Sequence, residues 1–436
     1  MTQLLYIPLY LLYTGLFLWL IFRWSFFDIE GTNKKHLAFF FLLKVVAGLG
    51  LTLIYTYYYT DQSKADIYRY FTDSKIISSI LFKDPVAWLK IMSGIGTGDR
   101  DVFSYLLTTL HYTHPAGDLV TSNSFLIKII SMLNYFSFYN IYIDTLFFNF
   151  ITFIGFTVLF KALRGFFAEF QAILFVPVYL IPSVIFWSSG LLKESIMYTG
   201  ICFYIYAWLK GNESRTTANT LLLIAALIVV ALTKIYVAVL LVLCSLFLPL
   251  SSITQIPYPL TRRVIVYAAI AFTGWYYFGA NFCEKIIYKR DEFILLGLSE
   301  NAGSSLDSAL LDPNCGSFFS ILPQALMNSI LRPFIWDKGA MFQLFFGAEN
   351  LLILLSLLTG LLLYFKRPAG TKLWLCIFCL SFSFLNYLVI GVTVPVMGAI
   401  VHYRIAAVPF LILAVLLMLD LEKLKRNLKL SHRFTD

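Results

Sequence analysis

The chain has 436 residues, of which 59% are hydrophobic and 13% are charged, and its mean hydropathy is +0.79. A soluble domain carries about 25% charged residues, so this composition excludes a water-soluble protein and indicates an integral membrane protein. The net charge of +9 does not indicate a nucleic-acid partner. No basic run is dense enough to form a polyanion groove, and Lys and Arg in short loops set membrane orientation.

The sequence predicts an all-α polytopic membrane protein, because alternating strand patterns are absent and helices satisfy their own backbone. We expect about eleven spans, most of them close to the ~20 residues that cross the hydrocarbon. The first lacks a basic leader and a small-residue cleavage site, so it is expected to be retained. The expected spans are Leu4–Phe22, His36–Tyr59, Ile141–Phe160, Ala172–Trp187, Ser195–Leu209, Ala218–Leu232, Ile235–Leu250, Val264–Ala280, Met341–Phe365, Leu373–Ile390 and Tyr403–Leu419.

Basic clusters in the short loops predict an outside N-terminus and a cytoplasmic C-terminus. These clusters are Arg23/Lys34/Lys35, Lys161/Arg164, Lys210/Arg215, Arg262/Arg263, Lys366/Arg367/Lys372 and residues 423–433. A short apolar segment, Ser124–Phe138, would reverse this orientation if it crossed, so we interpret it as an interfacial or re-entrant helix on the outer face. Lys44 is expected to lie near the cytoplasmic end of its span and to extend toward the lipid headgroups.

The chain is expected to form one transmembrane domain over residues 1–436, with extracytoplasmic loops at 60–140 and 281–340. Loops of this length are usually functional or disordered, and their Trp, Tyr, Phe and Pro content favours order. Cys283 and Cys315 fall in the second loop and either remain free or form a disulfide. Cys376 and Cys379 lie in an apolar span, where packing is favoured over zinc or redox chemistry.

Carboxylates and tyrosines gather at the start of the first outer loop. Such a carboxylate can act as a general base toward a sugar hydroxyl or can hold a divalent cation, and tyrosine rings can pack on sugars. The alternative is a solvated loop with an interfacial tyrosine belt. The residues concerned are Asp61, Asp66, Tyr68, Tyr70 and Asp73.

A second group of candidates lies at two short outer turns. Ser and Gly precede a helix that begins with Lys193 and Glu194, and a helix N-terminus attracts anions. Lys234 is the single charge between two apolar spans and is followed by Tyr236. A charge in the bilayer is costly and is often functional. A diphosphate cradle is one interpretation, and a capped turn with solvated or snorkelling charges is the other.

The last candidates are cations among aromatic residues late in the chain. Arg332 precedes Pro333, and Trp336 follows shortly. His402, Tyr403 and Arg404 open the final span. Arg binds phosphate through two parallel hydrogen bonds, so these residues are expected at an anionic substrate, although an interfacial Arg in water is the alternative.

At these residues the chain resembles the polytopic GT-C-type glycosyltransferases and the related O-antigen and exopolysaccharide polymerases, the Wzy and EpsG-like proteins. The segment Asp66-Ile67-Tyr68-Arg69-Tyr70 is similar to their Asp- and Tyr-containing first outer loop. His402-Tyr403-Arg404 with Pro409 is similar to a late span that opens with Arg and Tyr, and Leu331-Arg332-Pro333-Phe334 also resembles segments of this class. An Asp-x-Asp pair is missing at the start of the loop, which favours a polymerase that relies on cations over a metal-dependent transferase.

The resemblance implies polymerisation of oligosaccharide units from a polyprenyl-diphosphate donor at the outer face of a bacterial inner membrane. Asp66, Arg332 and Arg404 would be catalytic, and no cofactor is required unless carboxylates hold a divalent cation. The implied partners are the lipid-linked oligosaccharide, membrane lipid, and a chain-length regulator and flippase of the same pathway. The alternatives are a GT-C enzyme that adds one sugar, a lipid-linked glycan flippase, and a ligase or O-acyltransferase. A flippase would place its charges near the bilayer midplane, and an acyltransferase would need an intramembrane His.

Overall fold

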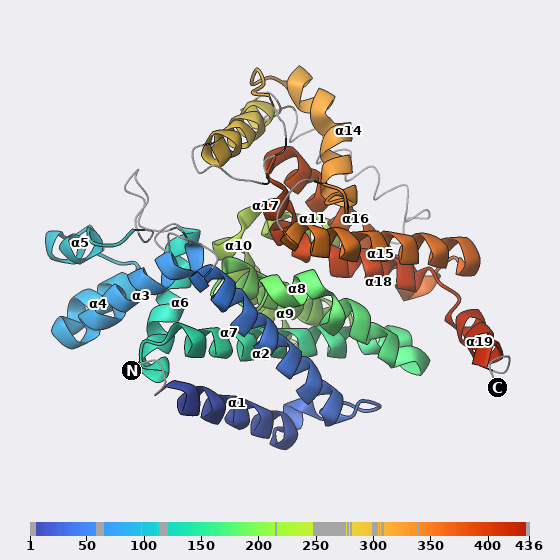
Figure 1. Cartoon of the computed structure of the whole chain (residues 1–436), viewed down its shortest axis with the longest axis horizontal. Coiled ribbons are helices and arrows are strands. Elements are labelled where there is room, and N and C mark those ends of the chain that lie inside the picture. Colours follow the sequence, from blue (N-terminus) through green and yellow to red (C-terminus); the bar gives the residue numbers. More distant parts are fainter. Residues whose placement is uncertain are drawn as a thin grey trace. The chain divides into compact units, whose positions relative to one another are not determined.

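The computed structural model describes residues 6–57, 65–96, 98–110, 112, 121–213, 216–246, 276, 279, 281–298, 304, 306, 309–337 and 341–432. Within these ranges the chain is predominantly helical, and its β-structure amounts to the isolated bridges Ile29–Thr32 and Phe365–Leu419. The chain divides into two compact units, Met1–Val239 (unit 1) and Leu240–Asp436 (unit 2) (Figure 1).

Apolar helices long enough to cross a membrane confirm the predicted class. Among the described residues five pass by length and composition, and a sixth does if the pair Met397–Ala406 and Val408–Leu417, bent by 52°, forms one span. The five are Tyr6–Arg23, Lys34–Tyr57, Ile141–Leu174, Gln343–Tyr364 and Gly370–Thr393. Eleven spans and their orientation remain a prediction, and the expected span Val264–Ala280 lies outside the described residues except for Tyr276 and Gly279.

The centre of unit 1 is a group of closely packed helices. Helices α1 (Tyr6–Arg23), α2 (Lys34–Tyr57) and α7 (Ile141–Leu163) pack on one another, and α9 (Lys193–Glu213) packs against both α7 and α10 (Thr217–Thr233). Small residues permit the close approach. A Cβ atom at Gly155 would lie 3.1 Å from Thr199 Cα, and one at Gly200 would lie 2.8 Å from Val230 Cγ2.

The expected span Ala172–Trp187 is not one helix. It consists of the end of a 3₁₀ segment (Arg164–Leu174), a five-residue π-helix (Val176–Leu180) and the short α8 (Pro182–Trp187). Pro177 and Pro182 explain the interruption, because proline lacks the N–H that continues a helix. The chain then turns through Ser188 and Ser189 before α9 begins.

Lys44 does not extend toward the headgroups, contrary to the prediction. Its side chain is 1% exposed. Its ammonium donates to the Ser188 carbonyl at 3.1 Å, to Ser188 Oγ at 2.8 Å and to Ser189 Oγ at 3.1 Å. It also lies 4.5 Å from the centre of the Phe156 ring. The broken segment supplies oxygen atoms that a continuous helix would not offer, so Lys44 is satisfied inside unit 1.

The predicted first outer loop is largely helical in its described residues. It contains α3 (Asp66–Lys83), α4 (Pro85–Ser93), α5 (Arg100–Leu106) and α6 (Ser122–Ser137). The helix α6 corresponds to the predicted short segment at 124–138, and it begins with a capping box between Thr121 and Ser124. It packs against α3 and the start of α7, while α4 and α5 continue away from α7 (Figure 1). Buried apolar side chains, Ile67, Ile77 and Leu126 among them, form the core.

Unit 2 contains a helix over residues 281–298, followed by six named helices and a short 3₁₀ segment. Helix α16 packs against α14 and α18, and α15 also contacts α18. The expected span at 403–419 is bent, because Arg404–Ala406 forms a 3₁₀ turn before Pro409 at the start of α18. The named helices are α14 (Cys315–Leu331), α15 (Met341–Tyr364), α16 (Gly370–Thr393), α17 (Met397–Tyr403), α18 (Val408–Leu417) and α19 (Leu421–His432).

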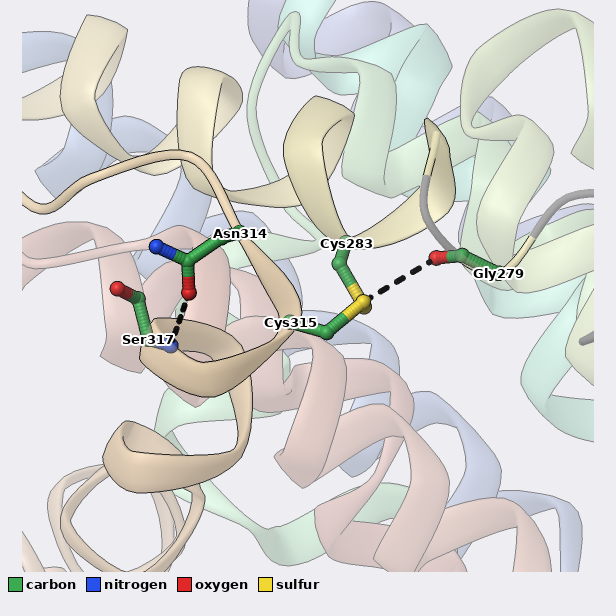
Figure 2. The surroundings of a disulfide bond; sticks show 5 residues. All are labelled: Gly279, Cys283, Asn314, Cys315 and Ser317. Atoms are coloured by element: carbon green, nitrogen blue, oxygen red, sulfur yellow. Dashed lines mark hydrogen bonds between the residues drawn. A yellow bond between two sulfur atoms is a disulfide. The ribbon is translucent and has the colours of Figure 1, made fainter.

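A disulfide joins Cys283 to Cys315, with Cα atoms 5.1 Å apart (Figure 2). It ties the helix at 281–298 to the first residue of α14, which Asn314 caps by accepting the Ser317 N–H at 2.8 Å. Disulfides persist in oxidising compartments. The bond is therefore in keeping with the predicted extracytoplasmic position of this loop.

We predict that substituting Gly200 with Leu lowers the free energy of unfolding by about 1–3 kcal/mol, because the larger side chain overpacks the contact with α10. Gly50→Leu is the matched control, since nothing lies within 4 Å of a Cβ atom there. Unfolding of the purified protein in detergent measures the difference. Equal losses for the two variants would contradict the packing of α9 on α10.

Thiol labelling of the denatured protein tests the disulfide. The chain has six Cys residues, and four of them are free. We therefore expect four maleimide additions before reduction and six after it, counted by intact mass. Cys283→Ser should raise the count before reduction to five, because Cys315 loses its disulfide partner and becomes a fifth free thiol. Six additions in the unreduced wild-type protein would exclude the bond.

Candidate functional site

A buried ion pair lies where α9 begins and α10 ends. Glu194 is in the first turn of α9, and Lys234 is the C-terminal cap of α10. Lys234 Nζ lies 2.5 Å from Glu194 Oε1, and the two side chains are 11% and 4% exposed. Lys234 is therefore held by a carboxylate within unit 1.

Lys193, the first residue of α9, contacts α6 and α3. Its ammonium donates to Ser122 Oγ at 2.8 Å and lies 5.9 Å from the centre of the Tyr70 ring. The Tyr70 hydroxyl donates in turn to Asn123 Oδ1 at 3.4 Å. Burial lowers the pKa of Lys193, and the carboxylates of Glu194 and Asp66 oppose that shift.

Asp66 completes this group from the exposed first position of α3. It lies close enough to act electrostatically on both Lys193 and Lys234. Burial lowers the pKa of Lys234. The carboxylate of Glu194 opposes this shift most strongly, and the carboxylate of Asp66 opposes it less. We call Asp66, Lys193, Glu194 and Lys234 the unit 1 charge set. Its two cations and two carboxylates balance, so it favours a polar ligand over a purely anionic one.

The remaining first-loop candidates differ in accessibility. Asp73 is fully buried and accepts the backbone N–H groups of Leu110 at 2.9 Å and Tyr112 at 3.0 Å. It thereby fastens the segment around Leu110 to α3, and its predicted role as a substrate-binding residue stays a prediction. The Tyr68 hydroxyl is 2.7 Å from Thr56 Oγ1. Asp61 lies outside the described residues.

Tyr236, which follows Lys234, is half-buried in α11 (Ile235–Ser245).

Arg404 is the centre of a second group, in unit 2. Its side chain is 1% exposed. Its Nη1 donates to the Arg332 carbonyl at 2.9 Å and to Asn350 Oδ1 at 3.0 Å. Its Nε and Nη2 have no hydrogen-bond partner among the described residues, although Tyr387 and Glu349 act on it electrostatically.

Arg332 follows α14 and forms a more exposed part of this group. Its Nη1 lies 3.6 Å from Asp337 Oδ1, and its side chain is 34% exposed. Asp337 Oδ2 accepts the Phe334 N–H at 2.7 Å, which closes the turn. The Phe334 and Trp336 rings stack with centroids 5.0 Å apart, and Trp336 is 75% exposed. We call Arg332, Asp337, Asn350 and Arg404 the unit 2 charge set.

His402 and Tyr403 are the last two residues of α17 and precede Arg404. Their rings stack with centroids 5.3 Å apart. Asn350 was missed by the sequence reasoning, although an amide in an otherwise apolar span is a usable signal. Its Nδ2 donates to the carbonyls of Ile330 at 3.2 Å and Leu331 at 2.7 Å. Asn350 thus joins the end of α14 to Arg404.

The predicted residues that the structure describes therefore fall into two sets, one in each unit. In the described part of the chain no three His, Cys, Asp or Glu side chains gather in an arrangement suited to a metal. No protein-family model, curated protein or solved structure matches the chain.

We expect Glu194→Leu and Lys234→Met each to lower the free energy of unfolding by about 3–5 kcal/mol, because each removes the nearest opposite charge from a buried charge. The double variant removes both charges and should recover most of that loss. Titration with denaturing detergent measures all three. If the loss of unfolding free energy in the double variant equals the sum of the two single losses, the ion pair is not the source of the effect.

Proposed function

We propose that this protein is a membrane glycosyltransferase that polymerises oligosaccharide repeat units. The donor would be a polyprenyl-diphosphate-linked oligosaccharide at the outer face of a bacterial inner membrane. The reaction forms a bond between the acceptor hydroxyl oxygen and the donor anomeric carbon. It breaks the bond from that carbon to the diphosphate oxygen, which leaves with negative charge.

The observation that carries the proposal is the incompletely paired guanidinium of Arg404. Two of its nitrogens have N–H groups without an acceptor in the described structure, and a buried donor without a partner costs about 1–3 kcal/mol. Phosphate oxygens would supply those acceptors. Preorganised donors of this kind stabilise developing negative charge, which here appears on the leaving diphosphate.

Arg332 and its aromatic neighbours support the same assignment. The Arg332 guanidinium carbon lies 5.8 Å from the centre of the Phe334 ring, and Trp336 presents an exposed face. An aromatic ring can pack on a sugar while the Arg binds phosphate. The unit 2 charge set is therefore assigned to the donor.

The unit 1 charge set is suited to binding glycan hydroxyls. Asp66 is exposed at the start of α3 and can accept a proton from a sugar hydroxyl. Lys193 and the pair Glu194–Lys234 supply donors and acceptors for neighbouring hydroxyls. The balanced charge of this set suits a neutral glycan better than a second diphosphate.

A flippase for the same lipid-linked glycan is the second candidate. It is favoured by charged side chains buried within membrane-length helices, namely Lys44, Asp144 and Glu349. Lys44, however, has three hydrogen bonds within the protein, which is a structural use of its charge. The polymerase therefore remains the first proposal.

We expect Arg404→Lys, which retains the charge but loses the paired donors, to reduce long-chain product by about 10²–10³-fold, as for loss of a transition-state donor. Asp66→Asn should have a similar effect. Arg367→Lys, at an exposed position, is the matched control. Mass spectrometry of polyprenyl-linked glycans and a surface-polysaccharide gel measure the products in a deletion strain that expresses each variant.

The products of the deletion separate the classes. Complete single repeat units at the cell surface without long chains indicate a polymerase, and a lipid-linked glycan one sugar short indicates a single-sugar transferase. Complete units that stay on the cytoplasmic side indicate a flippase. An unchanged profile in both assays would exclude a role in glycan assembly.

A further inference from the structure

The ends of α15 and α18 meet in unit 2. The residues that follow these helices form an antiparallel bridge between Phe365 and Leu419. Beside it the Lys366 N–H donates to the Met418 carbonyl at 2.8 Å. Helix α16 begins a few residues later, at Gly370. Because α15 and α16 are both long and apolar enough to cross a membrane, we place this bridge at a membrane boundary.

The start of α19 is held at the same place by hydrogen bonds. The Asp420 N–H, just before α19, donates to the Tyr364 carbonyl at 2.8 Å. Lys423 Nζ donates to the Leu363 carbonyl at 3.0 Å and lies 5.7 Å from the centre of the Tyr364 ring. Lys366 Nζ lies 4.0 Å from Asp420 Oδ2. Helix α19 is therefore attached to the end of a membrane-length helix, and Figure 1 shows it outside the packed helices of unit 2.

Exposed cations outnumber carboxylates at this boundary. Among the described side chains of the bridge and of residues 420–427, four are basic and exposed, and two, Asp420 and Glu422, are acidic. The contact of Lys366 with Asp420 is a surface ion pair, which is weak, so it does not cancel the excess of positive charge. Lys429 adds a further basic residue to α19. We call the four exposed cations the basic surface: Lys366, Lys423, Lys425 and Arg426.

Helix α19 carries apolar and basic residues on different faces. Leu421 and Leu424 are half-buried, and residues three positions apart lie on one side of a helix. Leu428 continues this spacing in the sequence. The exposed Lys423 and Arg426 fall on the other side. A helix that is rich in Lys and Arg and has one narrow apolar face is typical of helices that lie in the plane of a membrane interface.

The last turn of α15 exposes large apolar side chains beside the basic surface. Leu362, Leu363 and Phe365 are 74%, 56% and 61% exposed. Lys423 donates to the carbonyl of Leu363, so the apolar and the basic side chains are neighbours. A nucleic acid or an acidic soluble protein would pair with the cations but leave the apolar residues in water. A bilayer covers apolar residues with acyl chains and presents phosphates next to them, so it fits both parts of the surface.

We propose that the basic surface binds the headgroups of anionic phospholipids, with α19 lying in the interface of the leaflet at which α15 ends. The apolar face of α19 contacts the acyl chains, and the exposed cations pair with the phosphates. Each Lys or Arg close to an anionic membrane surface strengthens binding about fivefold. The basic surface shares no residue with either charge set, so this inference does not depend on the proposed function.

The test is lipid binding by the full chain in mild detergent, with bound lipids counted by native mass spectrometry. We expect phosphatidylglycerol to bind at least about tenfold more tightly than phosphatidylcholine. Lys425→Gln combined with Arg426→Gln should weaken phosphatidylglycerol binding about 25-fold and leave phosphatidylcholine binding unchanged. Lys285→Gln combined with Lys289→Gln, two exposed positions in the helix at 281–298, is the matched control and should bind as the wild type does. Equal affinity of the wild type for the two lipids, or equal losses in the two double variants, would overturn the proposal.

A second measurement locates the contact at α19 in the wild-type protein. Trypsin cleaves after Lys and Arg, so an exposed α19 offers it several sites. We expect cleavage within α19, followed by intact mass, to be at least about tenfold slower in nanodiscs of phosphatidylglycerol than in nanodiscs of phosphatidylcholine, because α19 is held in the interface of the first. Cleavage at the same rate in both nanodiscs would show that α19 does not bind anionic lipid, and would overturn the proposal.

Discussion

Within the hydrocarbon region of a bilayer, each backbone N–H or C=O that leaves a helix needs a partner supplied by the protein. Both units satisfy this constraint with side chains at the places where their helices break. In unit 1 the turn after α8 receives the Lys44 ammonium. In unit 2 Asn350 donates to the last carbonyls of α14, and Arg404 donates to the next one, that of Arg332. The polar residues inside these helices therefore follow from the interruptions.

The same breaks leave polar groups that a ligand could use. A side chain that closes a helix end rarely uses all of its hydrogen-bonding groups, and a long guanidinium has five N–H donors. Arg404 uses one of its nitrogens to join Arg332 and Asn350, and the others remain for a ligand. In unit 1 the Glu194–Lys234 pair and Lys193 lie at the junctions of α9 with α10 and α6. In both sets, the residues that join helix ends are also those to which the proposed function assigns substrate binding.

The helices that composition alone determines were predictable. The apolar runs near Leu4, His36, Ile141 and Leu373 form helices close to their expected bounds. The break at Pro177 and Pro182 was not predicted, because the sequence pattern of an apolar segment with prolines is the same in a continuous membrane span and in an interrupted one. The pairing of Glu194 with Lys234 joins residues 40 positions apart, which no local pattern reveals. Asp144 was overlooked, although a lone carboxylate in an apolar span is a signal.

The partners of Lys44 also bear on the biosynthesis of the protein. Ser188 and Ser189 lie 144 and 145 residues further along the chain, so α2 leaves the ribosome long before the oxygens that satisfy its ammonium exist. Until then the lysine carries an insertion cost of about 2.5–3.5 kcal/mol if it lies near the bilayer centre. The strong hydropathy of the rest of α2 has to outweigh that cost unaided. The insertion of α2 into the membrane therefore comes before the assembly of unit 1, in which Lys44 gains its hydrogen-bond partners.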